Sequence, residues 1–534
     1  MLHFSSIWET VADVCGDRPA LIGDAGVVSW RDYERRAARL ASAFEAAGLG
    51  LDSKVGIYLH NSNQYLETQF ATFKIGGCPV NVNYRYKADE LVYLLENSDA
   101  EALVFQSCYA ARIWEIRERL PKLKLLVQVD DGTEALLPEV RDYERIQRDC
   151  APRPRTEPVA GGIYMLYTGG TTGMPKGVMY DGQGFATAML TAGIMSRELP
   201  PALTLDALAD ALRAIEDPPV SLPASPLMHG TGMWIGAMIP HSIGGTVVTL
   251  SKIGLDADVL WSLVEQHDVT DMVIVGDAFA KPMLQALRNG AAQGRPYRPQ
   301  ALERIISSGV MWSAEVKAGL LEHLDVELRD VMGSSEGGMG ASVTTRHEAA
   351  QTATFELNEG TKVFTDEGQE VKPGSGVIGK VATSGMVPLG YYKDPEKSAA
   401  TFKEIDGVRY SFPGDYAQVE ADGTITLLGR GSVCINTAGE KVFPEEVEEA
   451  LKRHDDVDDV LVVGVPDDRF GERVVGVVAV VQAVADETLI GYARDQLAGY
   501  KVPKQIVFVD EVRRGPNGKA DYKWARAEAE RSVG

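Results

Sequence analysis

A run of eleven residues from Tyr167 to Gly177, "YTGGTTGMPKG", concentrates groups that bind phosphate. Its four glycines let backbone N–H groups turn toward one point, and converging N–H donors bind anionic oxygens. Threonine hydroxyls add neutral donors, and Lys176 adds a positive charge. The apolar run "GIYMLY" that precedes the loop is typical of a buried strand. The sequence therefore predicts a phosphate-binding loop, although it matches neither the Walker pattern nor GxGxxG.

Further charged residues lie in turn-rich segments later in the chain. Glu336 lies in "DVMGSSEGG", Asp415 in "SFPGDYAQVE" and Lys519 in the turn "RRGPNGKADYKW". Taken singly, each is most often a solvated surface charge.

Alternation of strands and helices predicts an α/β fold. "KVGIYL" precedes the amphipathic "NQYLETQFATFKIG", and "DMVIVG" precedes "AFAKPMLQALRNG". We expect a large N-terminal domain, residues 1–430, with mixed, mainly parallel sheets packed with helices. A small mobile α+β domain is expected over residues 431–534, with Pro444 at the first position of a helix. Residues 197–225 are interpreted as a helical surface insertion, with a lid or a dimer contact as the alternative.

Composition excludes several classes of protein. With 53 Lys and Arg against 76 Asp and Glu, the net charge of -23 argues against a nucleic-acid or anionic-membrane binder. The five cysteines are scattered without a CxxC pair, which favours reduced thiols. We find no signal peptide and no apolar run long enough for a membrane span. A cytoplasmic protein without stable membrane insertion is expected.

The loop "YTGGTTGMPKG" resembles the signature of the adenylate-forming superfamily, which includes acyl-CoA synthetases, peptide-synthetase adenylation domains and luciferases. Similar motifs follow in the family's order over nearly the whole chain: "SSGV", "DVMGSSEGG", "SFPGDYAQVEADGTITLLGR", "CINTAGEKVFPEEVEE" and "RRGPNGKADYKW". Four positions depart from the family pattern. Gly169 replaces a serine, Met332 an aromatic residue, Ser432 an aspartate or lysine, and Ala438 the first of two glycines.

The resemblance implies that ATP, Mg²⁺ and CoA are used. It assigns Glu336 to the metal, and Lys519 to a bridge between the substrate carboxylate and the α-phosphate. Gly439 would line the channel for the pantetheine arm of CoA, and Ser432 would be the hinge of the small domain. The residues implied for nucleotide binding are Thr168, Gly169, Gly170, Thr171, Thr172, Gly173, Lys176, Ser308, Gly309, Asp330, Met332, Gly333, Ser334, Ser335, Asp415, Arg430 and Lys519.

The acid is expected to bind near "PLMHGTGMW". On residue type alone, a histidine between Met and Gly is more often packed than catalytic. The resemblance makes His229 a catalytic candidate at the substrate carboxylate. Thr168 of the phosphate loop is a further catalytic candidate. Trp234, Val310 and Met332 would form apolar walls, which predicts a hydrophobic carboxylic acid. The motifs look most like those of fatty-acyl and steroid-side-chain CoA ligases.

Two alternatives to this assignment stay open. The acyl acceptor could be a carrier protein or an amine instead of CoA. The chain could also be a non-catalytic nucleotide sensor, which the four departures from the family pattern would suit. The presence of Glu336, Asp415, Arg430 and Lys519 argues against a sensor. A homodimer is left open.

Overall fold

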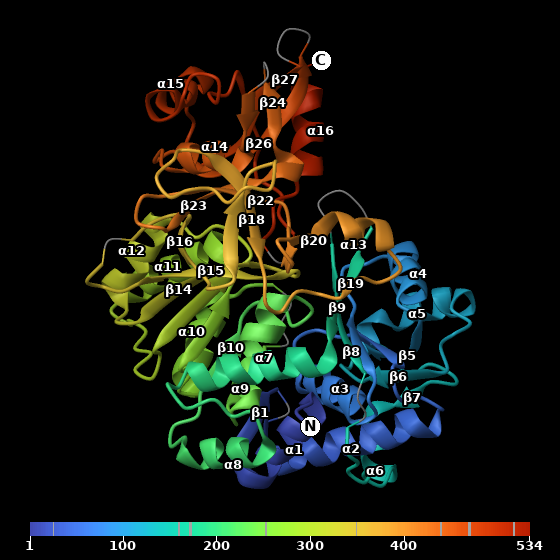
Figure 1. Cartoon of the computed structure of the whole chain (residues 1–534). Helices are drawn as coiled ribbons and strands as arrows, with labels where there is room; N and C mark the ends of the chain where they lie inside the picture. The colour runs from blue at the N-terminus through green and yellow to red at the C-terminus, as the bar shows by residue number, and fades with distance from the viewer. Residues whose placement is uncertain are drawn as a thin grey trace.

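The computed structural model describes the chain except residues 25, 159–160, 170–173, 251–253, 349, 438–439, 468–470, 516–517 and 534. A large body, coloured from blue to light orange in Figure 1, carries a smaller body in deeper orange and red at the C-terminal end. Within the described residues, no helix combines the length and apolar character needed to cross a membrane.

One layer of the large body is a parallel five-stranded sheet in the order β4-β3-β5-β6-β7. Its elements are β3 (Lys54–Tyr58), α3 (Asn63–Lys74), β4 (Cys78–Asn81), α4 (Ala88–Asn97), β5 (Ala100–Gln106), η1 (Ser107–Tyr109), α5 (Ala110–Ile116), η2 (Arg117–Arg119), β6 (Leu125–Val129), β7 (Arg141–Asp142) and α6 (Tyr143–Asp149). Strand β3 is buried along its whole length, as expected for a parallel strand covered on both faces.

A second, fifteen-stranded sheet begins with parallel strands around β10, β12 and β13. The elements of this region are α1 (Phe4–Val14), β1 (Pro19–Gly23), β2 (Gly26–Ser29), α2 (Trp30–Ala46), α7 (Gly182–Met195), α8 (Leu205–Ala214), β10 (Val220–Pro223), η3 (Thr231–Met238), α9 (Ile239–Ser242), β11 (Thr246–Val248), α10 (Ala257–Gln266), β12 (Asp271–Ile274), α11 (Gly276–Ala292), β13 (Arg304–Ser308), α12 (Ala314–His323) and β14 (Glu327–Ser334).

From β14 onward the same sheet continues through antiparallel pairs toward the small body. These later elements are β15 (Gly337–Thr344), β16 (Thr354–Leu357), β17 (Thr361–Phe364), β18 (Ile378–Thr383), α13 (Pro395–Thr401), β20 (Phe402–Ile405), β21 (Val408–Ser411), β22 (Asp415–Val419) and β23 (Ile425–Arg430). A separate antiparallel sheet joins β8 (Ile163–Thr168), β9 (Lys176–Asp181) and β19 (Gly390–Tyr391). The expected α/β fold with a mixed sheet is confirmed.

The small body follows β23 through the short turn η4 (Gly431–Val433). It contains β24 (Ile435–Thr437), β25 (Glu440–Val442), α14 (Pro444–Lys452), β26 (Val457–Asp467), β27 (Gly471–Val480), α15 (Asp486–Gln496), β28 (Gln505–Phe508) and α16 (Tyr522–Val533). The helix expected at Pro444 begins there, with acidic residues in its first turn and Lys452 in its last. The boundary at residue 430 remains a prediction.

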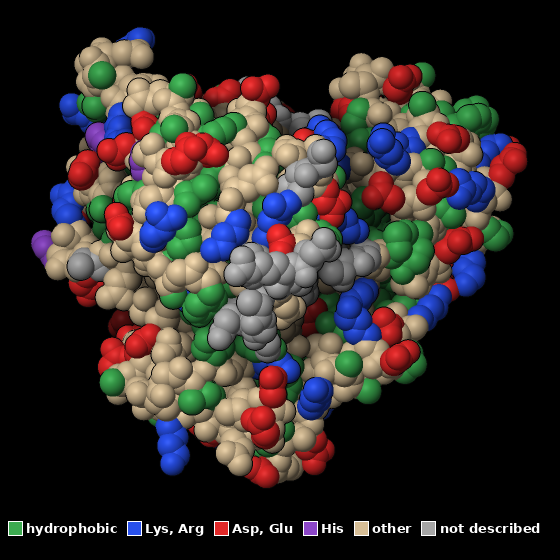
Figure 2. Space-filling model, turned by 90° about the horizontal axis from the view of Figure 1, so that it is seen from above, with side chains coloured by type: hydrophobic (Ala, Val, Ile, Leu, Met, Phe, Trp, Pro, Cys, Tyr) green, Lys and Arg blue, Asp and Glu red, His purple; other side chains and the backbone are tan. Residues whose placement is uncertain are grey.

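The helix of the predicted insertion is α8, and it lies on the surface against α1, at the end of the large body away from the small one (Figure 1). The expected end of the insertion at residue 225 is wrong, because Val220–Pro223 form β10, which pairs with β11 and β12 inside the large sheet. Leu208 and Leu212 of α8 are buried in the core, whereas Asp210 is exposed. The lid alternative is therefore wrong. Seen from above, acidic and basic side chains are interspersed over the described surface (Figure 2), so this face does not present the single-sign field of a nucleic-acid binder.

Candidate active site

A cavity of about 260 Å³ lies where the two bodies meet. The large body contributes strand ends and loops, and the small body contributes α14 and the Lys519 turn. Predicted site residues that line it are Thr168, Gly169, Lys176, Gly309, Val310, Asp330, Met332, Gly333, Ser334, Ser335, Glu336, Asp415, Arg430 and Lys519. Residues far apart in the sequence therefore face one space.

Four residues of the phosphate loop, Gly170, Thr171, Thr172 and Gly173, lie outside the described part of the chain, as does Gly439. Ser432 lies in η4, directly after β23. Ser308 is buried at the end of β13, beside Val331 of β14, and is not among the described lining residues of the cavity.

Lys519 reaches the cavity from a tight turn of the small body. The Gly515 N–H donates to the carbonyl of Lys519 at 2.7 Å, and Arg514 pins the turn by two bonds to Asp459, at 2.6 and 2.7 Å. Gly518 has a φ of +69°, and a Cβ there would lie 2.8 Å from the Cβ of Ala278 in α11. A side chain at position 518 would hold this turn away from the large body.

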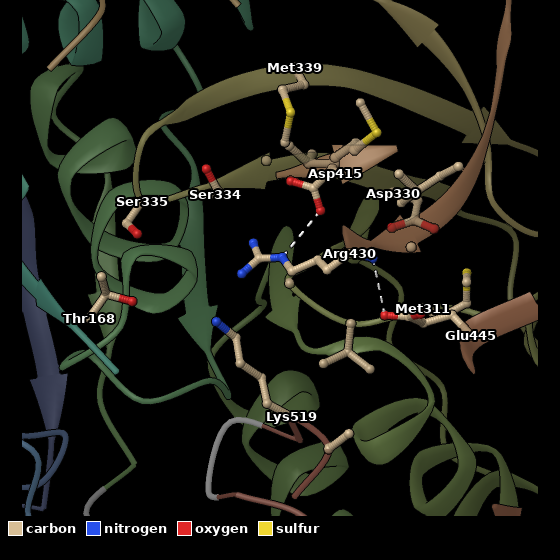
Figure 3. A pocket seen from close by; sticks show the side chains of 18 of the residues that line it. Thr168, Met311, Asp330, Ser334, Ser335, Met339, Asp415, Arg430, Glu445 and Lys519 are labelled. Carbon is tan, nitrogen blue, oxygen red and sulfur yellow. Dashed lines mark hydrogen bonds and ion pairs between the residues drawn. The ribbon is translucent and has the colours of Figure 1, made fainter. Parts of the chain in front are cut away.

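The Lys519 ammonium points into the cavity toward the Asp415–Arg430 pair (Figure 3). Burial and the nearby Arg430 lower its pKa, while Glu336 and Asp415 act in the opposite direction. Because phosphate oxygens would add negative charge beside it, a nucleotide would favour the protonated form.

Glu336 is oriented by neighbours from the large body. Its Oε1 accepts a hydrogen bond from the Tyr391 hydroxyl at 2.8 Å, and its Oε2 accepts from Ser335 at 3.0 Å. The Tyr180 hydroxyl donates to the backbone carbonyl of Ser335 at 2.9 Å. These contacts hold the carboxylate at the cavity wall before any ligand binds.

Asp415 and Arg430 face each other across the pair β22-β23. Arg430 Nε donates to Asp415 Oδ1 at 3.2 Å, as the dashed line in Figure 3 shows. The other carboxylate oxygen, Oδ2, is buried without a hydrogen-bond partner among the described residues. Asp415 thus keeps an acceptor for a ligand hydroxyl at the cavity.

Lys176 begins β9, opposite Thr168 in the β8-β9 pair. Its Nζ lies 5.3 Å from the centre of the Tyr391 ring. Burial, followed by the positive charge of Lys397, lowers the pKa of Lys176 to about 8. A phosphate group between these lysines would relieve that repulsion.

Asp330 of β14 and Gly309, directly after β13, form another part of the cavity wall. The Asp330 carboxylate is paired with the buried Lys317 at 3.1 Å, although burial still raises its pKa to about 6. Gly309 has a φ of +94°, a conformation that favours glycine. Met332 is buried beside Met339 and Phe355, so an apolar cluster stands where the family pattern has an aromatic residue.

His229 and Trp234 are not among the described lining residues of the cavity. Burial, followed by the charges of Lys519 and Arg85, lowers the pKa of His229 to about 3. Its Nε2 has no hydrogen-bond partner in the described part of the chain. Trp234 donates to the Tyr164 hydroxyl at 2.9 Å and packs on Phe185. His229 is therefore neutral at physiological pH, and Trp234 belongs to an aromatic cluster.

Sequence reasoning did not single out Glu445 and Glu448 of α14, which line the cavity. Burial and the neighbouring Glu448 raise the pKa of Glu445 to about 8, and burial raises that of Glu448 to about 7. The Glu445 carboxylate lies so close to Gly429 that a Cβ there would overlap it. The pattern "PEEVEE" gave only the signal of a helix start.

Comparison with known proteins identifies the family. The model of the AMP-binding enzyme family matches residues 8–392, and that of the AMP-binding enzyme C-terminal domain matches residues 446–519. The chain belongs to the AMP-binding enzyme family. The predicted superfamily is thereby confirmed.

Curated relatives match over nearly their whole length. A 3-oxocholest-4-en-26-oate–CoA ligase of Rhodococcus rhodochrous is 42% identical, over 98% of this chain and 95% of its own. A medium/long-chain-fatty-acid–CoA/3-oxocholest-4-en-26-oate–CoA ligase of Mycolicibacterium smegmatis is 39% identical, over 98% and 96%. The chain is an AMP-forming acyl-CoA ligase, an acid–thiol ligase that uses ATP and CoA.

The same fold occurs among solved structures. The crystal structure of the anthranilate CoA ligase AuaEII in complex with anthranoyl-AMP superposes with a TM-score of 0.85 at 21% identity. The match covers 99% of this chain and 98% of that one. At this identity the match supports the fold alone.

Proposed function

We propose that this ligase activates a large hydrophobic carboxylic acid, a fatty acid or the acid of a steroid side chain, and joins it to CoA. The observation that carries the proposal is the shared cavity, in which Lys519 of the small body meets Thr168, Glu336 and Asp415 of the large one. The names of the relatives that match at 39–42% identity support this substrate class.

In the first half-reaction the acid attacks the α-phosphate of ATP, forming acyl-AMP and releasing pyrophosphate. Thr168 and Lys176, paired across β8-β9, would bind the β- and γ-phosphates. Asp415 Oδ2 would accept from the ribose hydroxyls. Lys519 would stabilise the negative charge that develops at the α-phosphate, since a preorganised cation acts most strongly where charge builds up.

Glu336 would hold Mg²⁺ together with phosphate oxygens. Its carboxylate is already oriented by Tyr391 and Ser335 at the cavity wall. In the described residues, no group of three or more His, Cys, Asp or Glu side chains forms a protein metal cage, which suits an ion held by one carboxylate and its substrate. The metal would neutralise charge on the phosphates.

His229 would orient the substrate carboxylate as a neutral group. Because its pKa is about 3, the imidazole carries no charge at pH 7. A neutral ring can donate one hydrogen bond to the carboxylate without forming an ion pair that would weaken it as a nucleophile. The partnerless Nε2 supports this role.

In the second half-reaction the CoA thiol attacks the acyl carbonyl and releases AMP. We propose that the small body rotates about Ser432, withdrawing Lys519 and bringing the Gly439 segment to the site. One cavity would then serve two reactions through domain motion, a gating role common among enzymes with moving lids.

The experiment is pyrophosphate release from ATP, with CoA, for a panel of acids: dodecanoate, octadecanoate, 3-oxocholest-4-en-26-oate, benzoate and malonate. We expect release and a CoA thioester with at least one of the three large hydrophobic acids, and little with benzoate or malonate. Preferential turnover of benzoate or malonate would contradict the proposed substrate class.

A further inference from the structure

Asn81, the last residue of β4, joins two segments of the site. Its Nδ2 donates to the carbonyl of Tyr167 and to the carbonyl of Met228, each at 2.7 Å. Its Oδ1 accepts from the N–H of Tyr167, also at 2.7 Å. One side chain thus makes three hydrogen bonds, to two separate segments of backbone.

Each of these segments carries a proposed catalytic residue. Tyr167 directly precedes Thr168 at the end of β8, and Met228 directly precedes His229. Residues 224–229 contain no helix or strand, so backbone pairing within a sheet does not fix the position of His229. The His229 N–H donates to the carbonyl of Pro226 at 3.0 Å, and the His229 carbonyl accepts from the N–H of Met233 at 2.9 Å, but both bonds are local. The Asn81 carboxamide adds the tie between this segment and the end of β8.

A second carboxamide, that of Asn61, holds the beginning of the connection formed by residues 224–229. Asn61 donates to the carbonyls of Pro223 and Ser225, and accepts from the N–H of Leu227. These bonds stay within the connection and do not reach β8. Of these two carboxamides, Asn81 is the one that ties the histidine segment to the phosphate-binding strand.

Only a carboxamide in one orientation satisfies the bonds of Asn81. The NH₂ group supplies both donors and the oxygen supplies the acceptor. A carboxylate of the same shape could accept from Tyr167, but it could not donate to either carbonyl. Its charge would also repel both of them.

We propose that Asn81 is a positioning residue that sets the spacing between Thr168 and His229, and so aligns ATP with the acid. This inference rests on the roles proposed above for those two residues. A displacement of about 1 Å between reacting groups can cost roughly 10²-fold in rate. Three bonds from one rigid strand end suit that requirement.

Gln128 offers a matched control for the test. It lies in β6 of the same sheet, is 2% exposed, and also donates two bonds and accepts one. Its partners are Ser107, Ala135 and Leu137. Gln128→Glu therefore makes the same amide-to-carboxylate change at a carboxamide with three hydrogen bonds, without touching either site segment.

The measurement is ATP–pyrophosphate exchange with dodecanoate, or with whichever panel acid the wild-type enzyme uses, alongside thermal unfolding. We expect Asn81→Asp to lower kcat roughly 10- to 100-fold. Gln128→Glu should stay within about threefold of wild type at a similar loss of Tm. Equal losses of kcat in the two variants would overturn the proposal. A wild type that uses only benzoate or malonate would refute the substrate class, and this test would still be decisive.

A double-mutant cycle separates positioning from general destabilisation. In a His229→Ala background, Asn81→Asp should cost a clearly smaller factor than in the wild type, because one of the two groups whose spacing it sets is gone. The same factor in both backgrounds would refute the proposal. If Asn81→Asp does not fold, Asn81→Ala is measured in the same cycle, with the same outcomes.

Discussion

On the large-body wall of the cavity, Glu336 and Asp415 are held by side chains of the large body itself. On the small-body wall two buried carboxylates, Glu445 and Glu448, lie beside one another and accept hydrogen bonds from the backbone N–H groups of Arg430 and Val462. The Glu336 carboxylate accepts hydrogen bonds from Tyr391 and Ser335, and the Asp415 carboxylate accepts one from Arg430. Glu445 and Glu448, in contrast, both have raised pKa values because of burial.

This difference is the one expected if the large body stays in place and the small body moves, as proposed above. Groups that stay in place can be satisfied by permanent neighbours, which preorganises them for catalysis. Groups on a moving body exchange water for protein at each closure, and their protonation then changes with it. If the small body moves as proposed, the charges of Glu445 and Glu448 would make its closure depend on their protonation, while the large body's hydrogen bonds would keep Glu336 and Asp415 in place for catalysis.

Blocking closure at Gly429 is expected to have a larger effect than a change of pH or a substitution at Gly169. Because the residue has a φ of +128° and lies against the Glu445 carboxylate, Gly429→Ala adds both backbone strain and overlap. Strain of this kind costs ~1–3 kcal/mol, so we expect adenylation to fall roughly tenfold or more. Rates of ATP–pyrophosphate exchange of Gly429→Ala, with and without Glu445→Ala, separate the backbone strain from the overlap with the Glu445 carboxylate. No recovery in the double variant would mean that contact with Glu445 is not the obstacle.

A smaller effect is expected from pH. The closed form binds a proton at Glu445 that an exposed glutamate would release, so closure is favoured at low pH and weakens as pH rises from 4.5 toward about 8. Asp415, Arg430 and Glu448 are the charged neighbours of this carboxyl. Glu445→Gln should flatten the pH dependence of closure. Closure is measured by energy transfer between dyes attached to the two bodies. An unchanged profile would show that Glu445 does not control it.

The smallest effect is expected on the large-body wall, at Gly169. Among the described residues, a Cβ at this position meets nothing within 4 Å, so they leave room for a serine. Its hydroxyl would add one neutral hydrogen bond, worth about 0.5–1.5 kcal/mol. We expect Gly169→Ser to lower the KM for ATP roughly two- to tenfold, with Gly169→Ala as the control. If the two variants have the same KM, the serine hydroxyl contributes nothing here.

Motif order in the sequence predicted Thr168, Glu336, Asp415, Arg430 and Lys519 as one site, and the structure brings them to one cavity. Each of them stands in a turn or at a strand end with a recognisable local pattern. The family, fold class and enzyme class could therefore be predicted from sequence.

Residues whose role depends on distant partners could not be found in this way. In the sequence, Glu445 fits a favourable helix start. Nothing in the residues around it shows that its carboxylate lies against Gly429. Asn81 reads as an ordinary residue at the end of a strand, since its partners lie 86 and 147 residues away. Trp234 donates to the Tyr164 hydroxyl within an aromatic cluster, a setting that its local sequence does not show, and its place at the acid stays a prediction.

The central claim is that Lys519 acts only in the closed form and only in the first half-reaction. Lys519→Ala tests it by comparing two rates in one preparation: pyrophosphate exchange, and thioester formation from supplied acyl-AMP and CoA. We expect exchange to fall by roughly 10²–10³-fold, the loss typical of one preorganised electrostatic group, while the thioester reaction stays within about threefold. Equal losses in both half-reactions, or survival of both, would contradict the account.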